Sequence, residues 1–458
     1  MSYLKIIIVG AGKVGFFLAE QLSREQHDVT VIDSSEESLR RVADALDVMS
    51  FKGNGVTADV LRQAGAEQAD ILVAATDRDE VNMVCCLSAR KMGCRYTIAR
   101  IRNPEYFSNL SAFKRDMGIS MVINPERATA REIARLLRFP SAANIESFCR
   151  GRVELMSFRV QKDDFITGKP LFSLSGQLQK LSMLFCAAER EGEVIIPNGA
   201  FVPQPDDKLY IIGQSAGVDQ FFRLLGRYSH KAKNVMLIGG GRITIYLAEL
   251  LEQMHMRVKI VERSEERCRA LSEQLPKTMV ICGDGTDQEV LDSESLTSSD
   301  AFVALTDRDE DNLIISLYAM QQGLGKVIAK SNRHNYAGIA RAVGLDSVIS
   351  PKLITAAHIL HVVRGMQNSQ GSVMHALYRI ADDQAEATEF SVNKNTQYLG
   401  VPLKDLRLKK GILVAVIVRE DTVIIPDGSA CILEGDSVII VSREHTVLDV
   451  NDIFDTSF

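Results

Sequence analysis

The sequence lacks any apolar run that approaches the ~20 residues of a membrane-spanning helix. It starts with Met1-Ser2-Tyr3-Leu4-Lys5 and continues directly into an apolar strand, so we expect no signal peptide. An excess of positive charge is also absent. The net charge is -6, which gives no electrostatic footprint for nucleic acid. We therefore expect a cytoplasmic protein that does not bind nucleic acid.

Cysteine and histidine are few and do not form functional patterns. The eight cysteines are scattered without Cys-x-x-Cys spacing, so neither a zinc site nor a redox motif is predicted. The adjacent Cys85 and Cys86 fit buried packing residues. The histidines suggest no catalytic base. His358 and His361 could bind a metal from one helix face, but packing is favoured, because no acid or cysteine flanks them. No catalytic residue and no metal site is predicted.

The sequence does contain a glycine-rich turn, and this motif occurs twice. In the first copy, Ile6-Ile7-Ile8-Val9 leads into Gly10-Ala11-Gly12-Lys13-Val14-Gly15, and the next apolar strand ends at Asp33. In the second copy, Val235-Met236-Leu237-Ile238 leads into Gly239-Gly240-Gly241-Arg242-Ile243-Thr244, and the next apolar strand ends at Glu262. The order of strand, glycine turn, helix, strand and acid is typical of a dinucleotide-binding fold.

The repeat continues far beyond these turns. Ala74-Ala75-Thr76-Asp77-Arg78-Asp79-Glu80 matches Ala304-Leu305-Thr306-Asp307-Arg308-Asp309-Glu310. Much later, Val194-Ile195-Ile196-Pro197-Asn198-Gly199 matches Val423-Ile424-Ile425-Pro426-Asp427-Gly428. The period is about 230 residues, so the whole chain is a two-part unit that has been duplicated.

The first part of each unit alternates short apolar strands with helical stretches, which predicts an α/β, Rossmann-like doubly wound parallel sheet. The second part, beginning near Arg152 and near Glu386, predicts a small α+β module. Strands are expected at 6–9, 29–32, 48–51, 71–74, 97–101 and 120–123, and exit helices at 127–137 and 353–363. The predicted domains are 1–140, 145–228, 232–367 and 372–458, with linkers near 140–146, 229–233 and 368–371.

The first glycine turn has the features of a phosphate site. Gly10 permits the tight turn, Gly12 lets the backbone approach a pyrophosphate, and Gly15 lets the helix pack closely on the strand. The helix N-terminus offers free N–H groups to the phosphates. Asp33 is expected to accept hydrogen bonds from ribose hydroxyls, which favours NAD or an adenosine nucleotide over NADP. A helix-capping role for Asp33 is compatible with this.

Further candidates follow the next two predicted strands. Thr76 and Asp77 stand at a strand end where a ligand is expected, and Arg100 could reach phosphate oxygens from the neighbouring strand end. Arg102 is a weaker candidate. Asp79 and Glu80 fit better as a solvated helix start, where the helix dipole favours acids.

The second copy provides a matching but altered set of candidates. Thr244 replaces the third glycine, so its helix is expected to pack less closely or at another angle. Glu262 replaces Asp33, which remains compatible with ribose binding. The candidates of the second site are Gly239, Gly240, Gly241, Arg242, Ile243, Glu262, Thr306, Asp307 and Lys330.

These motifs together resemble the regulator-of-potassium-conductance (RCK, or KTN) family. The glycine turn, Gly53-Asn54-Gly55, Ala74-Ala75-Thr76-Asp77 and Ala99-Arg100-Ile101-Arg102 resemble its N-terminal domain. Gly168-Lys169-Pro170-Leu171 and the Ile-Ile-Pro-x-Gly turns resemble its C-terminal module. Two such units in one chain resemble the TrkA family, the regulatory subunits of the Trk potassium uptake system, over essentially the whole sequence.

The resemblance implies a regulator that binds NAD(H) or ATP/ADP at the candidate residues of both copies. It implies a ring, a tetramer of tandem chains, attached to the inner face of the cell membrane beneath a potassium transporter of the TrkH/TrkG type. Two other classes are weighed beside it. An NAD-dependent oxidoreductase with a degenerate second copy would need a substrate pocket, which the small modules do not suggest. A dimerising scaffold would not be stabilised by nucleotide.

Overall fold

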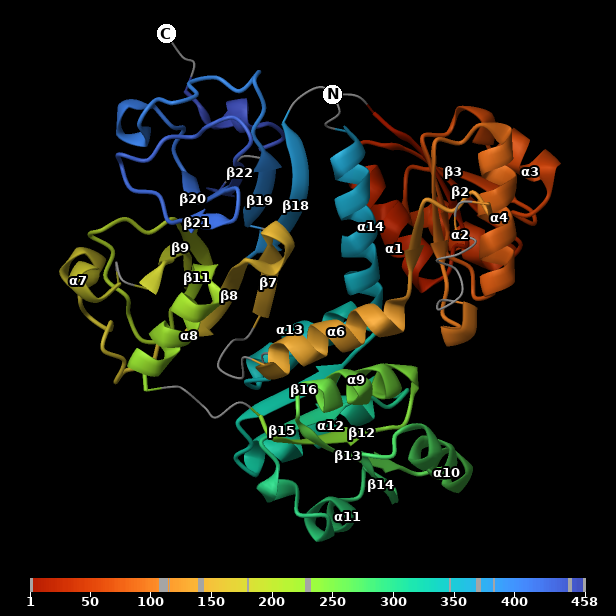
Figure 1. Ribbon diagram of the computed structural model, residues 1–458. Coiled ribbons are helices and arrows are strands. Elements are labelled where there is room, and N and C mark those ends of the chain that lie inside the picture. The colour runs from red at the N-terminus through yellow and green to blue at the C-terminus, as the bar shows by residue number, and fades with distance from the viewer. Residues whose placement is uncertain are drawn as a thin grey trace. The chain divides into compact units, whose positions relative to one another are not determined.

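The structure is a computed structural model of the chain. It describes residues 3–106, 114, 116–138, 144–178, 181–226, 232–345, 347–367, 372–381, 384–443 and 447–455. The chain divides into two compact units (Figure 1). Unit 1 combines residues 1–134 with 233–363, and unit 2 combines residues 135–232 with 364–458. No helix within these described ranges is long and apolar enough to cross a membrane.

Unit 1 begins with a six-stranded sheet in the order β3-β2-β1-β4-β5-β6, and all its neighbouring strands are parallel. Its strands are β1 (Lys5–Val9), β2 (Asp28–Asp33), β3 (Met49–Lys52), β4 (Ile71–Ala74), β5 (Tyr96–Arg100) and β6 (Met121–Ile123). The central strands β1 and β4 are nearly continuous buried apolar runs, as expected of parallel strands covered on both faces. The chain leaves β1 and β4 in opposite directions, which makes their carboxyl ends the switch point for a ligand.

Helices connect these strands and cover the faces of the sheet. They are α1 (Lys13–Arg24), α2 (Glu36–Ala45), α3 (Ala58–Gln63), α4 (Asp79–Met92) and the exit helix α6 (Pro125–Arg138). The buried residues of α1 are Gly15, Leu18, Ala19 and Leu22, which follow the helical period and face the sheet. Cys85 and Cys86 on α4 are fully buried in the same core, and burial raises the pKa of the Cys85 thiol to about 12. Both cysteines are therefore packing residues.

The second half of unit 1 repeats this arrangement. Its sheet has the order β14-β13-β12-β15-β16-β17 with parallel neighbours. The strands are β12 (Asn234–Ile238), β13 (Arg257–Glu262), β14 (Met279–Cys282), β15 (Ala301–Ala304), β16 (Lys326–Lys330) and β17 (Val348–Ile349). The helices are α9 (Arg242–Gln253), α10 (Glu265–Gln274), α11 (Gln288–Ser293), α12 (Asp309–Gln321), α13 (His334–Ala342) and α14 (Pro351–Gln367). The prediction of two doubly wound Rossmann-like domains is confirmed.

Unit 2 consists of two small modules, each built on a five-stranded antiparallel sheet with the same topology. The first sheet, β10-β9-β11-β8-β7, comprises β7 (Asn144–Phe148), β8 (Val153–Arg159), β9 (Met183–Arg190), β10 (Glu193–Ile195) and β11 (Lys208–Gln214). The second, β18-β19-β22-β20-β21, comprises β18 (Val373–Ile380), β19 (Ala385–Ser391), β20 (Ile412–Arg419), β21 (Thr422–Ile424) and β22 (Ser437–Arg443). Helices α7 (Ser175–Leu178) and α8 (Ser215–Leu224) belong to the first module.

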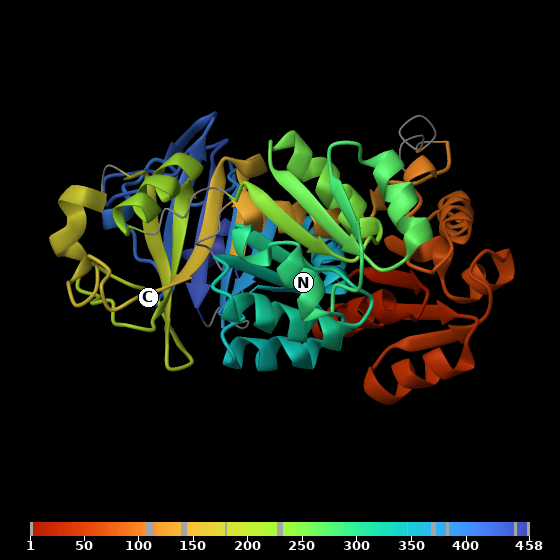
Figure 2. The ribbon, with the colours of Figure 1, turned by 90° about the horizontal axis from the view of Figure 1, so that it is seen from below.

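The two modules share one hydrophobic core. Buried residues of the first sheet, such as Val153 and Ile212, belong to the same cluster as Ala387 and Ile439 of the second. Figure 2 shows the strands of the two modules side by side, the first in yellow and green and the second in blue. Each module therefore covers the apolar sheet face of the other.

The structure adds one strand before the predicted strand region of each small module. The sequence places this region near Arg152 and near Glu386, but strands β7 and β18 lie earlier, so the expected linker at 140–146 overlaps a strand. The exit helices also extend beyond both predicted ends. The expected linker at 368–371 and most of that at 229–233 lie outside the described residues. The four domain boundaries themselves stay a prediction.

Candidate nucleotide-binding sites

The first glycine turn joins β1 to α1 at the switch point of the sheet. Gly10 has a positive φ of 104°, a conformation that favours glycine, and its N–H donates to the Ile32 carbonyl at 2.8 Å. A Cβ at Gly10 would lie 3.0 Å from the backbone nitrogen of Thr76. The turn therefore packs directly against the carboxyl end of β4.

Gly12 and Gly15 meet very different surroundings. A Cβ on Gly15 would overlap the carbonyl oxygen of Gly10, so this position holds the helix against the turn and tolerates no side chain. A Cβ on Gly12 would have no atom within 4 Å. The packing of the chain therefore does not explain glycine at position 12, whereas the close approach of a ligand does.

The Asp33 side chain links the end of β2 to the glycine turn by a hydrogen bond. Its carboxylate accepts a hydrogen bond from the Ala11 N–H at 2.6 Å and another from the Ser35 N–H at 2.7 Å. Ser35, and not Asp33, caps α2 through its side chain. Each carboxylate oxygen has a second lone pair, so these contacts position Asp33 without preventing it from accepting further hydrogen bonds.

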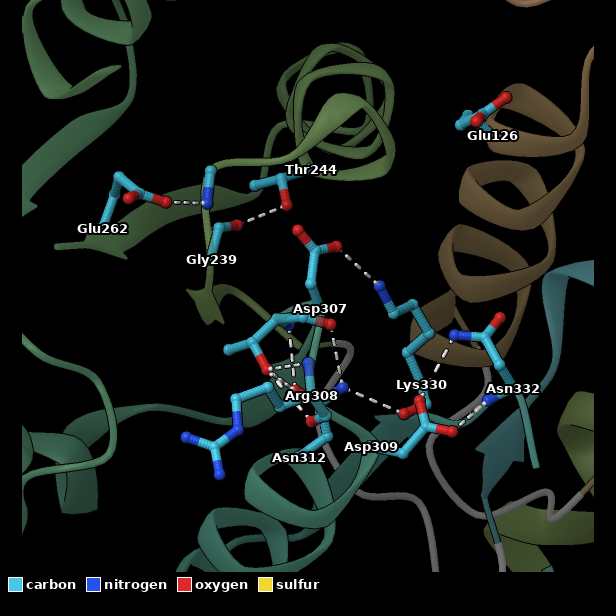
Figure 3. A network of polar contacts seen from close by, with 12 residues as sticks. Glu126, Gly239, Thr244, Glu262, Asp307, Arg308, Asp309, Asn312, Lys330 and Asn332 are labelled. Atoms are coloured by element: carbon cyan, nitrogen blue, oxygen red, sulfur yellow. Dashed lines mark hydrogen bonds and ion pairs between the residues drawn. The ribbon is translucent and has the colours of Figure 1, made fainter. Parts of the chain in front are cut away.

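The second turn keeps these contacts with different residues, as Figure 3 shows. The Glu262 carboxylate accepts from the Gly240 N–H at 2.7 Å and the Ser264 N–H at 2.8 Å. The hydroxyl of Thr244 donates to the Gly239 carbonyl at 2.5 Å. That carbonyl corresponds to the Gly10 oxygen that a Cβ on Gly15 would overlap, so α9 must stand farther from its turn than α1 does.

Two asparagines that the sequence did not single out organise the ends of the neighbouring strands. Asn82 is fully buried on α4, and its Oδ1 accepts from the backbone N–H of Thr76 at 2.9 Å and from the Thr76 hydroxyl at 2.7 Å. Its Nδ2 donates to the carbonyl of Arg100 at 2.8 Å. Asn312 makes the same contacts with Thr306 and Lys330. Their shared position in the repeat is the signal that could have identified them.

Arg100 and Lys330 lie at equivalent strand ends, but their cationic groups have different partners. The Arg100 guanidinium donates to the Thr76 carbonyl at 3.0 Å, and burial lowers the pKa of this guanidinium. Its Nε is buried and has no hydrogen-bond partner among the described residues. Lys330 is buried, and its Nζ lies 3.6 Å from a carboxylate oxygen of the fully exposed Asp307. The first site thus contains an unsatisfied cationic donor, whereas the second contains an ion pair.

Asp79 corrects the sequence interpretation of a solvated helix start. Its side chain is buried, and its Oδ2 accepts from the backbone N–H groups of Arg102 and Asn103 at 2.8 and 2.7 Å. Asp309 holds the equivalent loop in the second copy. Glu80 is exposed, as expected. The Nε of Arg102 donates to the Glu126 carboxylate at 2.6 Å, so Arg102 forms an ion pair within the protein.

The remaining candidates lie at the same edges of the two sheets. Lys13 and Arg242 are the first residues of α1 and α9, and both are exposed. Ile243 is buried and Asp77 is exposed. In each copy the structure therefore places the turn, the strand-end acid, the threonine and the cationic residue at one edge of the sheet.

The family follows from comparison with known proteins. The TrkA-N domain family model matches residues 6–125 and 235–351, and the TrkA-C domain model matches residues 387–455. The Trk system potassium uptake protein TrkA homolog 2 of Methanosarcina mazei is 34% identical, with 98% of this chain and all of that protein covered. The chain belongs to the TrkA family. TrkA of Halomonas elongata is likewise 34% identical, with 98% of both chains covered.

Solved structures of related fold agree with this family. The RCK domain of the GsuK channel matches with a TM-score of 0.62 and 17% identity, over 97% of this chain and 93% of that one. The GsuK channel bound to NAD matches with a TM-score of 0.63 and 18% identity, over 97% of this chain and 77% of that one. At this identity the likeness concerns the fold. This chain therefore has the fold of the GsuK RCK domain.

Proposed function

We propose that this TrkA-family chain is a nucleotide-sensing regulatory subunit that opens or closes a membrane potassium transporter. The observation that carries the proposal is the first site, where Gly12 has no packing neighbours and the Nε of the partly buried Arg100 has no hydrogen-bond partner among the described residues. A bound phosphate would occupy the open space at Gly12, and the strand-end guanidinium of Arg100 would supply a positive charge to its oxygens. Family membership supports the link to potassium uptake.

The residues fit a dinucleotide or an adenosine nucleotide. The turn and the first N–H groups of α1 would hold the phosphates, and Asp33 would accept from the ribose hydroxyls. NAD(H) and ATP/ADP are the ligand classes that we propose, and two GsuK structures, described as bound to NAD and bound to ADP, support them. The second site would hold the same classes through Gly239–Ile243, Glu262, Thr306 and Asp307.

Regulation requires that the nucleotide bind one conformation of the assembly better than another. We propose that the chain forms a ring of four tandem subunits, attached to the inner face of the membrane by a transporter of the TrkH/TrkG type. A tenfold difference in nucleotide affinity between two ring conformations would shift their ratio by about 1.4 kcal/mol. The role is regulatory, and we assign no residue to catalysis.

Arg100→Ala tests the proposal directly. Removing this charged donor from a phosphate contact should weaken NAD or ATP binding by about 10–100-fold, because hydrogen bonds to charged groups contribute roughly 1.5–3 kcal/mol. Isothermal titration calorimetry with NAD, NADH, ATP and ADP measures the change. Potassium uptake in cells that carry the variant measures its consequence for transport.

The matched control is Arg24→Ala, which removes an exposed arginine that pairs with Glu20 on α1. Binding and uptake should stay unchanged in this variant, since exposed ion pairs contribute little. Unaltered nucleotide affinity and uptake in Arg100→Ala would contradict the proposal. Steady consumption of NADH, followed by its absorbance, would instead favour an oxidoreductase.

A further inference from the structure

Two cysteines that are distant in sequence meet beside the second candidate site. Cys268 lies on α10, and its thiol donates to the Glu262 carbonyl at 3.2 Å. The same sulfur lies 3.9 Å from the carbonyl oxygen of Ile281, the residue directly before Cys282. Cys282 ends β14 and is the register partner of Glu262. Burial, and after it the neighbouring Cys282 thiol, raises the pKa of Cys268.

The pair exists in the second copy alone. Cys268 is the fourth residue of α10, and Cys282 is the last residue of β14. The fourth residue of α2 is Leu39, and the last residue of β3 is Lys52. The first copy thus packs a leucine at one position and directs an exposed lysine to Glu36 from the other.

We propose that Cys268 and Cys282 form a reversible oxidation site that takes small disulfides such as oxidised glutathione and controls the second nucleotide site. Cys282 is exposed and can be reached by such an oxidant, whereas Cys268 is buried. Metal binding by the two thiols is less favoured, because no group of three His, Cys, Asp or Glu suited to a metal exists within the described chain.

The chemistry proceeds in two exchanges. The Cys282 thiolate attacks one sulfur of oxidised glutathione, which breaks that disulfide, forms a mixed disulfide and releases one glutathione thiol. The Cys268 thiolate then attacks the sulfur of Cys282 and releases the second glutathione. The two protons lost by the cysteines are taken up by the two glutathione thiols, so the cysteines are oxidised and glutathione is reduced.

Oxidation would alter the second site through the backbone of Glu262. The Cys268 thiol loses its proton, so the Glu262 carbonyl loses a donor, and the new bond ties α10 to the end of β14. Glu262 is the residue whose carboxylate fixes the second turn, through the Gly240 N–H. This part rests on the proposed function, because it concerns nucleotide affinity. We expect the affinity of the second site to change by about tenfold or more, and that of the first to stay constant.

Peptide mapping by mass spectrometry tests the oxidation site without any nucleotide. Full-length protein treated with oxidised glutathione should yield a Cys268–Cys282 linked peptide that dithiothreitol reverses. Cys268→Ser should trap Cys282 as its glutathione adduct, and Cys282→Ser should leave Cys268 unmodified. Burial raises the pKa of Cys268 to about 11, so the closing step should accelerate about tenfold per pH unit near neutrality.

Cys431→Ser provides the control, because Cys431 is partly exposed in the other unit and should not affect the linked peptide. Recovery of Cys282 as a stable glutathione adduct in the unmutated chain, with Cys268 free, would overturn the proposal. Circular dichroism verifies that Cys268→Ser and Cys268→Ala are folded. If either variant fails to fold, peptide mapping of the unmutated chain still tests the proposal. Calorimetry with NAD or ATP before and after oxidation then tests the effect on nucleotide affinity separately from the oxidation site. If the chain binds no nucleotide, the proposed function fails, but the peptide map still shows whether the disulfide forms.

Discussion

At the scale of single residues, the two sites differ in what fills the space around their turns. The first has a glycine at position 15, and the buried Nε of Arg100 has no hydrogen-bond partner among the described residues. In the second, Thr244 donates to the carbonyl of Gly239, and the Arg267 guanidinium donates to that of Gly240 at 2.7 Å. The second turn is thus more thoroughly bonded by its own chain. We therefore expect the two sites to bind nucleotide with different affinities.

Gly12→Ala and Gly15→Ala should separate ligand contact from packing. At Gly12 the added methyl group meets no protein atom, so stability should hardly change, while nucleotide affinity should fall by about tenfold or more. At Gly15 it overlaps the Gly10 carbonyl, so the free energy of unfolding should fall by about 1–3 kcal/mol. Urea unfolding and calorimetry measure the two effects.

The converse change, Thr244→Gly, serves as the control. It removes a fully buried methyl group together with a hydroxyl that donates one hydrogen bond, and it places glycine in α9, so a loss of about 1–3 kcal/mol is expected. A large loss of stability in Gly12→Ala, or unaltered nucleotide affinity, would contradict the division of roles between the two glycines.

At the scale of elements, the predictable features are those encoded in neighbouring residues. The strands of both parallel sheets and the glycine turns follow from short apolar runs and from glycine spacing. Strand β7 was missed because Asn144-Ile145-Glu146-Ser147-Phe148 is largely polar and becomes a strand through antiparallel pairing with β8. Asn82 and Asp79 were missed as positioning residues because their partners lie 18 to 24 residues away. Contacts between elements depend on the fold, so spacing alone does not reveal them.

Strand β8 also carries a buried carboxyl group whose titration can be tested. Burial raises the pKa of Glu154 above its ordinary value of 4.5, although a hydrogen bond from Ser215 and the nearby Arg138 oppose the shift. The folded state therefore binds the proton more tightly than the unfolded state does. The stability that this group contributes is complete below pH 4.5 and declines as the pH rises through the folded-state pKa.

Glu154→Gln should accordingly raise the melting temperature more at pH 8 than at pH 5, because the amide never takes on a buried charge. Differential scanning fluorimetry across this range measures the difference between the variant and the unmutated chain. Glu36→Gln is the control of opposite sign, since Lys52 and Arg40 lower the pKa of the Glu36 carboxyl. A pH-independent effect of Glu154→Gln would contradict the raised pKa of this carboxyl.

At the scale of the whole molecule, duplication has produced two halves that complete each other. The modules of unit 2 share one core, and polar bonds cross between them. The Cys149 N–H donates to the buried Glu389 carboxylate at 2.8 Å, and the Ala381 N–H donates to the Tyr210 hydroxyl at 3.1 Å. Cys149 and Ala381 occupy equivalent turns, both with positive φ. In each module, a side chain therefore accepts a hydrogen bond from a backbone N–H in a positive-φ turn of the other module.

This arrangement predicts the behaviour of one half of the chain. A fragment of residues 1–232 would expose the sheet face that carries Phe148, Val153 and Ile212, all of which are buried in the whole chain. Contiguous apolar surface of this kind drives association, and a two-fold pairing of identical modules would cover it. We expect this fragment to form a homodimer, and to exchange into a heterodimer when residues 233–458 are added. Light scattering after size exclusion measures both states.

Phe148→Asp in the fragment is the matched variant, because a charge in the shared core opposes either pairing. It should yield a monomer or an unfolded chain, which circular dichroism distinguishes. A folded, monomeric fragment without the substitution would contradict the prediction, because the first module would then be stable without its duplicate. Since the pairing face is apolar and the crossing bonds are buried, salt should disrupt the dimer far less than urea does.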